Sequence, residues 1–254
     1  MKGIRPHSHA DRERVLKELV PAFLETFGDN LVAVAAQASY ARREDVAYSD
    51  LEIAVFLRAA TPERPLGWTS TIRDGLLIEI WYTTRDDYIG KIKEVTDEWY
   101  IAGSDVIEPL VNAPFLEEMR ALVLPNLPEK CRRQVLKLWP GFQEDVTKTL
   151  NAIDAGNCDG LPMVLFYLMK DTLALAAFLN ERPYTTLGRY IPQARELPLK
   201  PDGLDGFLDT MVAADYTDLA KLRQTVAGMF EGFERTIEAQ GITLYPYGKL
   251  PGEA

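Results

Sequence analysis

The sequence predicts an α+β fold in which a mixed region of strands and helices comes first and a helical bundle follows. Residues 31–36, 51–57 and 75–82 are apolar and rich in β-branched or aromatic side chains, as buried strands are. From Pro114 onward apolar residues recur with a helical period instead. Prolines at 125 and 128 make a natural linker. We therefore expect two domains, residues 1–125 and residues 126–254.

The remaining expected elements follow from the same patterns. Residues 11–27 have the apolar spacing of an amphipathic helix, which Pro21 is expected to bend or interrupt. Residues 61–67 are typical of a loop, and a helix is expected at 85–95. The later part of the chain shows helical periodicity at residues 116–123, 131–138, 142–155, 163–179 and 219–239.

Composition and charge limit the classes of function. The chain of 254 residues is 47% hydrophobic and 26% charged, which is ordinary for a globular protein. Its 28 basic and 38 acidic residues give a formal net charge of −10. Such a surface repels phosphate backbones, so nucleic acid is not expected as a partner, whereas a cationic substrate would be attracted.

The sequence also favours a cytoplasmic protein without a membrane partner. Its longest apolar stretch, Leu161–Met169, ends at Lys170 and Asp171, short of the ~20 residues that a membrane crossing needs. The charged N-terminus lacks the apolar core of a secretion signal. Cys131 and Cys158 lack the spacing of a zinc site and are expected to be reduced thiols.

Histidine usage restricts the possible chemistry. The only histidines, His7 and His9, lie close to the N-terminus, so a general base elsewhere in the chain is expected to be a carboxylate. No glycine-rich phosphate-binding loop of the P-loop or Rossmann type is present. These two classes of nucleotide-binding protein are therefore excluded.

Three carboxylates form the most informative constellation. Asp50 and Glu52 are two residues apart on an expected strand and so share one face, while Glu79 interrupts the apolar run of the next strand. Clustered buried carboxylates repel one another, and Mg²⁺ removes that conflict while binding substrate phosphates. The alternative is that Asp50 and Glu52 are solvated charges at the mouth of an edge strand.

The context of these carboxylates resembles the nucleotidyltransferase superfamily, which has a polymerase-β-like catalytic domain. The matching residues are Ala38-Ser39-Tyr40-Ala41-Arg42, followed by Ser49-Asp50-Leu51-Glu52 and then Glu79 on the next strand. The departure is Ala38, where the superfamily has glycine because the backbone approaches the triphosphate closely. The resemblance implies that Asp50, Glu52 and Glu79 bind Mg²⁺ and that Ser39 and Arg42 bind the nucleotide. Arg43 is an alternative to Arg42.

Over nearly its full length the chain is similar to the aminoglycoside 4'-O-nucleotidyltransferases, the kanamycin nucleotidyltransferase family. Beyond the core motif, the matching segments are Leu77–Ile80, Glu98-Trp99 and Tyr184–Thr186. The resemblance implies transfer of AMP from ATP, or of another nucleotide, to the 4'-hydroxyl of an aminoglycoside antibiotic, by a homodimer with a shared active site. The alternatives are a nucleotidyltransferase that acts on another small molecule or a protein, and a degenerate member that only binds nucleotide.

The resemblance also assigns residues in the second half and at the substrate. Glu144 matches the family's general base, and Lys148 matches a lysine near the phosphates, although Glu-Lys at this spacing is also a common helix-stabilising ion pair. Glu98, with Glu79, is assigned to substrate ammonium groups; the alternative for Glu98 is a surface charge beside a core tryptophan. The family's acidic residue at the Gly67 position is either lost here or replaced by Asp74.

Overall fold

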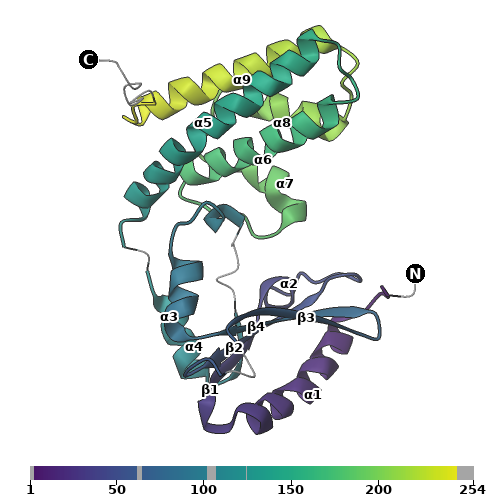
Figure 1. Ribbon diagram of the computed structural model, residues 1–254, viewed down its shortest axis with the longest axis vertical. Coiled ribbons are helices and arrows are strands. Elements are labelled where there is room, and N and C mark those ends of the chain that lie inside the picture. The colour runs from purple at the N-terminus through teal and green to yellow at the C-terminus, as the bar shows by residue number, and fades with distance from the viewer. Residues whose placement is uncertain (1–2, 62–64, 102–106, 124, 245–254) are drawn as a thin grey trace. The chain divides into compact units, whose positions relative to one another are not determined.

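The computed structural model describes residues 3–61, 65–101, 107–123 and 125–244 (Figure 1). The chain divides into two compact units, Met1–Pro125 and Asn126–Ala254. In the described part of the first unit, strands and helices are mixed, whereas the described part of the second is built of helices. The expected α+β fold class is therefore confirmed.

The first unit is organised around a mixed sheet. Its described strands are β1 (Leu31–Ala36), β2 (Leu51–Leu57), β3 (Gly67–Arg73), β4 (Leu76–Thr83) and β5 (Glu108–Val111). They lie in the order β3-β4-β2-β1-β5, with β2 and β4 parallel and the other neighbours antiparallel. Strands β1, β2 and β4 were expected from the sequence, whereas β3 and β5 were not.

The alternation of β2 separates the two faces of this sheet. Leu51, Ile53 and Val55 point into a core cluster that includes α1 (His9–Phe27), which runs along one face (Figure 1). Ala54 and Phe56 point to the opposite face and pack with Trp81, Tyr88 and residues of α4 (Ala113–Ala121). The expected orientation of the apolar β2 side chains is thus confirmed, and Glu52 shares the face that carries Ala54.

Two helices of this unit differ in extent or type from what the sequence predicted. Pro21 lies inside α1, which runs unbroken to Phe27 because its apolar side packs against the sheet. The helix expected at 85–95 is shorter: α3 covers Arg85–Tyr88 and a π-helical turn, η2, covers Ile89–Lys93. The other short elements are η1 (Gly28–Asn30), α2 (Ala38–Ala41) and η3 (Trp99–Ile101).

The second unit is a helical bundle. Its described elements are α5 (Leu127–Asp154), α6 (Leu161–Leu179), η4 (Leu187–Arg189), α7 (Tyr190–Arg195), α8 (Leu204–Ala213) and α9 (Leu219–Ala239). Helix α5 runs through Pro140, where the sequence predicted two helices. Trp139 and Phe142, on either side of this proline, stack with Phe230 of α9, so packing keeps the helix continuous.

Helix α6 is a long and strongly apolar helix. With 19 residues and a hydropathy of 1.5, it is the one described helix long and apolar enough to cross a membrane by length and composition. The sequence had suggested a shorter apolar run. Inside the bundle, 56% of the apolar window is buried, and Leu165, Leu168 and Leu175 are fully enclosed. This burial is typical of the core helix of a globular unit.

Candidate functional site

Three carboxylates meet on one face of the sheet in the first unit. Asp50 immediately precedes β2, Glu52 lies in β2, and Glu79 lies in β4. Because β2 and β4 pair in parallel, Glu52 is the direct cross-strand neighbour of Glu79. One ligand atom from each of the three side chains lies within 4.8 Å of the others, a separation that one metal ion can bridge. The structure thus brings together the three residues that the sequence singled out.

The electrostatic environment of this carboxylate cluster is unfavourable without a ligand. Burial, and then the charges of Asp50 and Glu79, raise the pKa of Glu52 to about 7. Burial and the charge of Glu79 also raise the pKa of Asp50. Arg42 acts in the opposite direction on the pKa of Glu52, and Arg12 on that of Asp50. Three hard oxygen donors under mutual repulsion suit a small divalent cation such as Mg²⁺.

Ser70 is a further member of this site that the sequence analysis did not identify. It lies in β3 opposite Glu79, and its hydroxyl donates a hydrogen bond of 3.2 Å to Glu79 Oε1. The turn between β3 and β4 could have been found from Asp74-Gly75, because an Asp-Gly pair next to a strand is a hairpin signal. Both residues have positive φ, as a tight hairpin turn requires.

The same hairpin shows whether Asp74 can replace the acidic residue that the family has at the Gly67 position. Gly67 begins β3 and pairs with Tyr82, whereas Asp74 follows the last residue of β3 at the opposite end of the strand. Asp74 therefore does not replace a side chain at the Gly67 position. A neighbouring aromatic pair does lie near Gly67: Trp68 is exposed and stacks on the buried Trp81, with ring centroids 5.6 Å apart.

The segment that connects β1 to the carboxylate cluster contains α2. Its first residue, Ala38, has a φ of 51°, a left-handed conformation that glycine adopts without strain. A left-handed backbone at this position explains why the superfamily pattern has glycine there. In this chain Ala38 adopts the same left-handed conformation. Ser39, the expected nucleotide ligand, is half-buried in α2, and its carbonyl accepts a hydrogen bond from the Glu44 amide.

Arg42 lies beside the carboxylate cluster. Its side chain is only 9% exposed, and Nε donates to Glu44 Oε2 at 3.0 Å. Nη1 is buried and has no hydrogen-bond partner among the described residues. A buried guanidinium nitrogen without an acceptor is costly, and a phosphate oxygen is one group that would satisfy it. Arg43 is exposed and pairs instead with Glu108, so it does not duplicate this arrangement.

Glu144 and Lys148 lie on helix α5 of the second unit. Their side chains are 64% and 56% exposed, and Lys148 Nζ lies 2.8 Å from Glu144 Oε1. The hydrogen bond and charge of Lys148 lower the pKa of Glu144. This is the helix-stabilising ion pair named as the alternative to catalysis. The assignments of Glu144 as general base and Lys148 as a phosphate ligand stay predictions.

The other matches to the family have distinct environments. Glu98 is exposed and precedes the buried Trp99, so its assignment to the substrate also stays a prediction. Tyr184 is buried, and its hydroxyl donates to the Leu173 carbonyl at 3.0 Å. Thr185 binds Gln193 through both its amide and its hydroxyl. The Tyr-Thr-Thr segment therefore packs helices together.

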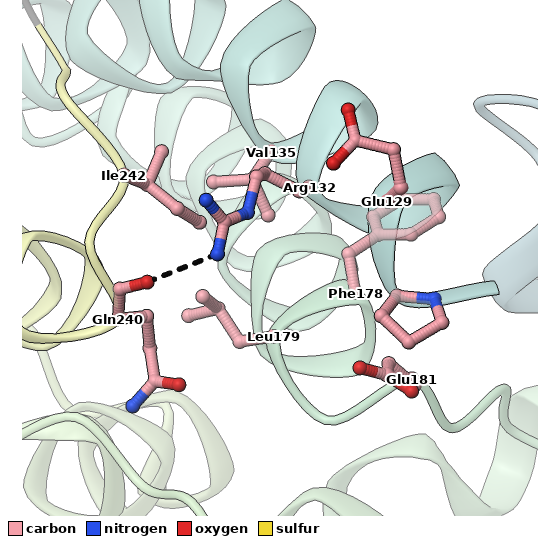
Figure 2. A pocket seen from close by; sticks show the side chains of 9 residues that line it. Glu129, Arg132, Val135, Phe178, Leu179, Glu181, Gln240 and Ile242 are labelled. Atoms are coloured by element: carbon pink, nitrogen blue, oxygen red, sulfur yellow. Dashed lines mark hydrogen bonds between the residues drawn. The ribbon is translucent and has the colours of Figure 1, made fainter. Parts of the chain in front are cut away.

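A separate pocket in the helical unit contains none of the expected site residues (Figure 2). It has a volume of about 360 Å³ and lies between α5, the end of α6 and the segment after α9. Arg132 reaches across it and donates to the Gln240 carbonyl at 3.2 Å. Since this arginine is already used to hold the end of α9, the pocket gives no independent indication of a catalytic site.

Comparison with known proteins agrees with this architecture. A mixed sheet with three clustered carboxylates on adjacent strands, followed by helices, defines the nucleotidyltransferase class of fold. A crystal structure of a nucleotidyltransferase-like protein from Exiguobacterium sibiricum shares this fold, with a TM-score of 0.50 at 11% identity over 90% of this chain and 75% of that chain. An aminoglycoside nucleotidyltransferase (4') from a Bacillus species is 19% identical over 99% of this chain and 100% of its own length.

The family model of the KNTase C-terminal domain matches residues 115–243, about half of the chain. The chain belongs to this family. The match lies mainly over the helical unit, whereas the carboxylate cluster lies in the sheet of the first unit. The family relation supports nucleotidyl transfer as the general activity, and an enzyme of that class requires a nucleoside triphosphate and a divalent metal.

Proposed function

We propose that this protein transfers AMP from ATP to a hydroxyl of an aminoglycoside, the 4'-hydroxyl in the first instance, with release of pyrophosphate and consequent antibiotic resistance. The single observation that supports this most is the cluster of Asp50, Glu52 and Glu79, because it has the donor set for a metal-bound triphosphate. The substrate class is suggested by the relative named aminoglycoside nucleotidyltransferase (4'), which aligns over its whole length.

In this mechanism Asp50, Glu52 and Glu79 would hold Mg²⁺, and the bound ion would supply charge neutralisation at the triphosphate. Arg42 donates its unpaired Nη1 hydrogens to phosphate oxygens, and Ser39 precedes it by three residues in the connecting segment. Lys148 neutralises the remaining phosphate charge. Ser70 orients Glu79 by donating to one of its carboxylate oxygens.

Glu144 takes the proton from the substrate hydroxyl. The resulting oxygen attacks the α-phosphorus and forms a new P–O bond, while the bond to the bridging oxygen breaks and pyrophosphate leaves with its electron pair. For this step Glu144 exchanges its bond with Lys148 for one with the substrate hydroxyl. We also propose that the chain works in the cytoplasm as a homodimer with a shared active site. Glu144 then acts at the carboxylate cluster of its own subunit or at that of the partner subunit.

Charge supports an aminoglycoside as the acceptor. An aminoglycoside carries several ammonium groups, and the chain has a formal net charge of −10. The exposed Glu98, together with Glu79, would supply local negative charge to the substrate. Because such attraction between partly exposed charges is screened by ions, affinity for the acceptor should fall as salt rises.

The test is incubation of the full chain with Mg-ATP and a panel of aminoglycosides, with pyrophosphate and product mass as readouts. A product heavier by one AMP supports the proposal, and a deoxy acceptor that lacks the 4'-hydroxyl identifies the position. Neutral sugars, peptides and other nucleoside triphosphates serve as comparison substrates. Nucleotide binding without transfer to any acceptor would instead indicate a degenerate member, and product with only a neutral acceptor would overturn the aminoglycoside assignment.

A further inference from the structure

Arg12, in the first turn of α1, is a fully buried charged side chain in the first unit. Its guanidinium makes five hydrogen bonds, which matches its five N–H groups. Nε and Nη2 both donate to the Ser49 carbonyl, at 3.2 and 2.5 Å, and Nη2 also donates to the Val46 carbonyl at 2.8 Å. Nη1 donates to the His7 carbonyl and to Asp45 Oδ2, at 3.0 and 3.1 Å.

These acceptors lie mainly on one short loop, residues 45–49, which leads into β2. Asp45 is only 2% exposed and also pairs with His9 Nδ1 at 2.7 Å. Within the loop, the Val46 amide donates to Ser49 Oγ at 3.0 Å, and the Ala47 carbonyl accepts from the His7 amide at 2.7 Å. Arg12 thus holds the loop at its first two residues, Asp45 and Val46, and at its last, Ser49.

The last of these residues, Ser49, directly precedes Asp50. The carbonyl that receives two hydrogen bonds from Arg12 belongs to the peptide group whose nitrogen is that of Asp50. This peptide plane determines the direction in which the Asp50 side chain leaves the backbone. Since Glu52 and Glu79 lie on rigid strands and repel Asp50, an untethered loop would move Asp50 away from them.

We propose that Arg12 is the positioning residue of the carboxylate cluster, which holds Asp50 in place for the metal by anchoring the loop at residues 45–49. The inference rests on the proposed metal role of Asp50, Glu52 and Glu79. Arg12 does not touch the metal or the substrate; it acts through the Ser49 carbonyl. An arginine is required because lysine has three N–H groups and cannot satisfy the same acceptors at once.

The experiment measures Mn²⁺ binding to the metal-free full chain by titration calorimetry, without nucleotide or acceptor. Thermal unfolding is followed on the same samples. Arg12→Lys keeps the charge but loses the fork of donors, and Asp45→Asn weakens the anchor from the loop side. Leu16→Ala is the matched control, because Leu16 is buried one turn further along α1 and packs in the sheet core. Its effect is on stability alone.

We expect Arg12→Lys to weaken Mn²⁺ binding by about 10- to 100-fold, as loss of residues that orient metal ligands does. Asp45→Asn should weaken it less, and Leu16→Ala should lower the unfolding temperature without changing Mn²⁺ affinity. Unchanged affinity in folded Arg12→Lys would overturn the inference, as would an equal loss in Leu16→Ala. If Arg12→Lys does not fold, Asp45→Asn decides, and unchanged affinity there overturns it.

The same titration separates this inference from the proposed function. A wild-type chain that binds no Mn²⁺ would refute the metal assignment, and the positioning role of Arg12 with it. A wild-type chain that binds Mn²⁺ together with an Arg12→Lys chain that binds it equally well would refute the positioning role alone. Failure to modify aminoglycosides has no bearing on either result, because no acceptor is present.

Discussion

The three clustered carboxylates of the first unit and the single candidate carboxylate of the second, Glu144, lie in very different surroundings. In the first unit Asp50, Glu52 and Glu79 lie within 4.8 Å of one another, and the pKa values of Asp50 and Glu52 are raised by burial and mutual repulsion. In the second unit Glu144 is exposed, paired with Lys148 at 2.8 Å, and has a lowered pKa. The carboxylate cluster is electrostatically unfavourable in the metal-free protein, whereas Glu144 has a favourable ion pair with Lys148 on the same helix.

This difference separates what the structure supports from what the resemblance supports. A half-buried cluster of like charges is a cost to the folded protein, so its presence is evidence for a ligand that removes the cost. An exposed Glu-Lys pair stabilises a helix in any protein and needs no ligand. The metal site therefore follows from physical argument together with the family, while the role of Glu144 depends on the family alone.

The largest expected effect concerns the metal cluster. Glu52→Gln should lower nucleotidyl transfer by at least about 10³-fold, because several kcal/mol of charge stabilisation at the transferring phosphate are lost. The steady-state rate of pyrophosphate release measures this. Glu25→Gln, an exposed glutamate of α1, is the control and should retain wild-type turnover. Near wild-type turnover in Glu52→Gln would remove the physical basis of the comparison.

The second prediction tests Glu144 directly. Glu144→Gln should lower kcat by about 10²–10⁴-fold if Glu144 is the general base, with little change in KM for ATP. Glu231→Gln removes a similar exposed pair with Arg235 on α9 and should leave kcat unchanged. If both variants keep the wild-type kcat, Glu144 is only the ion-pair partner of Lys148. The carboxylate cluster and Glu144 would then differ in function as well as in environment.

The third prediction concerns pH and the metal-free protein. The pKa of Glu52 is about 7 in the folded chain against an ordinary 4.5. The unfolded state therefore loses this proton first, so the free energy of unfolding should fall as pH rises from 4.5 to 7, by about 3 kcal/mol in all. Below pH 4.5 the carboxyl is protonated in both states and this penalty is absent.

Urea unfolding of the metal-free chain at a series of pH values measures this slope. Glu52→Gln should flatten it, and millimolar Mg²⁺ should restore stability above pH 7 by binding the folded state. Glu144→Gln should leave the slope unchanged well above pH 4.5, because Glu144 is ionised there in the folded state, where its pKa is lowered, and in the unfolded state, where its pKa is the ordinary 4.5. Parallel curves for the wild type and Glu52→Gln would contradict the assigned cause of the raised pKa.

The residues of the candidate site also differ in how well they could be predicted from the sequence. Asp50, Glu52 and Glu79 were predictable because strand alternation places residues two apart on one face and an isolated acid in an apolar run is conspicuous. Ser70 was not, because all of β3 beyond Gly67 is exposed and carries no alternating burial signal. The anchoring role of Arg12 was not predictable either, because its acceptors are mainly backbone carbonyls 34 and 37 residues away.

In the helices, local rules failed where packing outweighed them. The sequence predicted separate helices at 131–138 and 142–155, but the aromatic contacts of Trp139 and Phe142 with Phe230 keep α5 continuous through Pro140. Helix α8 was missed although Leu204, Phe207 and Leu208 have the i, i+3, i+4 spacing of a helix face, so its signal was present in the sequence. For α5, by contrast, the deciding contacts are with a residue distant in sequence, which periodicity does not report.

The smallest expected effect compares backbone strain in the two units. Ala38, at the start of α2 beside the carboxylate cluster, and Ala214, at the end of α8, both have a φ of 51°. A left-handed conformation costs an alanine about 1–2 kcal/mol, and glycine recovers part of this while adding flexibility to the unfolded chain. Ala38→Gly and Ala214→Gly should each therefore raise the free energy of unfolding by about 0.5–1 kcal/mol.

The two substitutions should differ in their effect on function. Ala38 lies one residue before Ser39 in the segment proposed to bind the triphosphate, so Ala38→Gly should change KM for ATP, whereas Ala214→Gly should leave it unchanged. Urea unfolding and initial rates at varied ATP measure both quantities in the same preparations. A gain in stability from both variants with an altered KM in neither would show that the strain at Ala38 is incidental to nucleotide binding. A loss of stability in Ala38→Gly alone would show that its methyl group makes a contact that outweighs the strain.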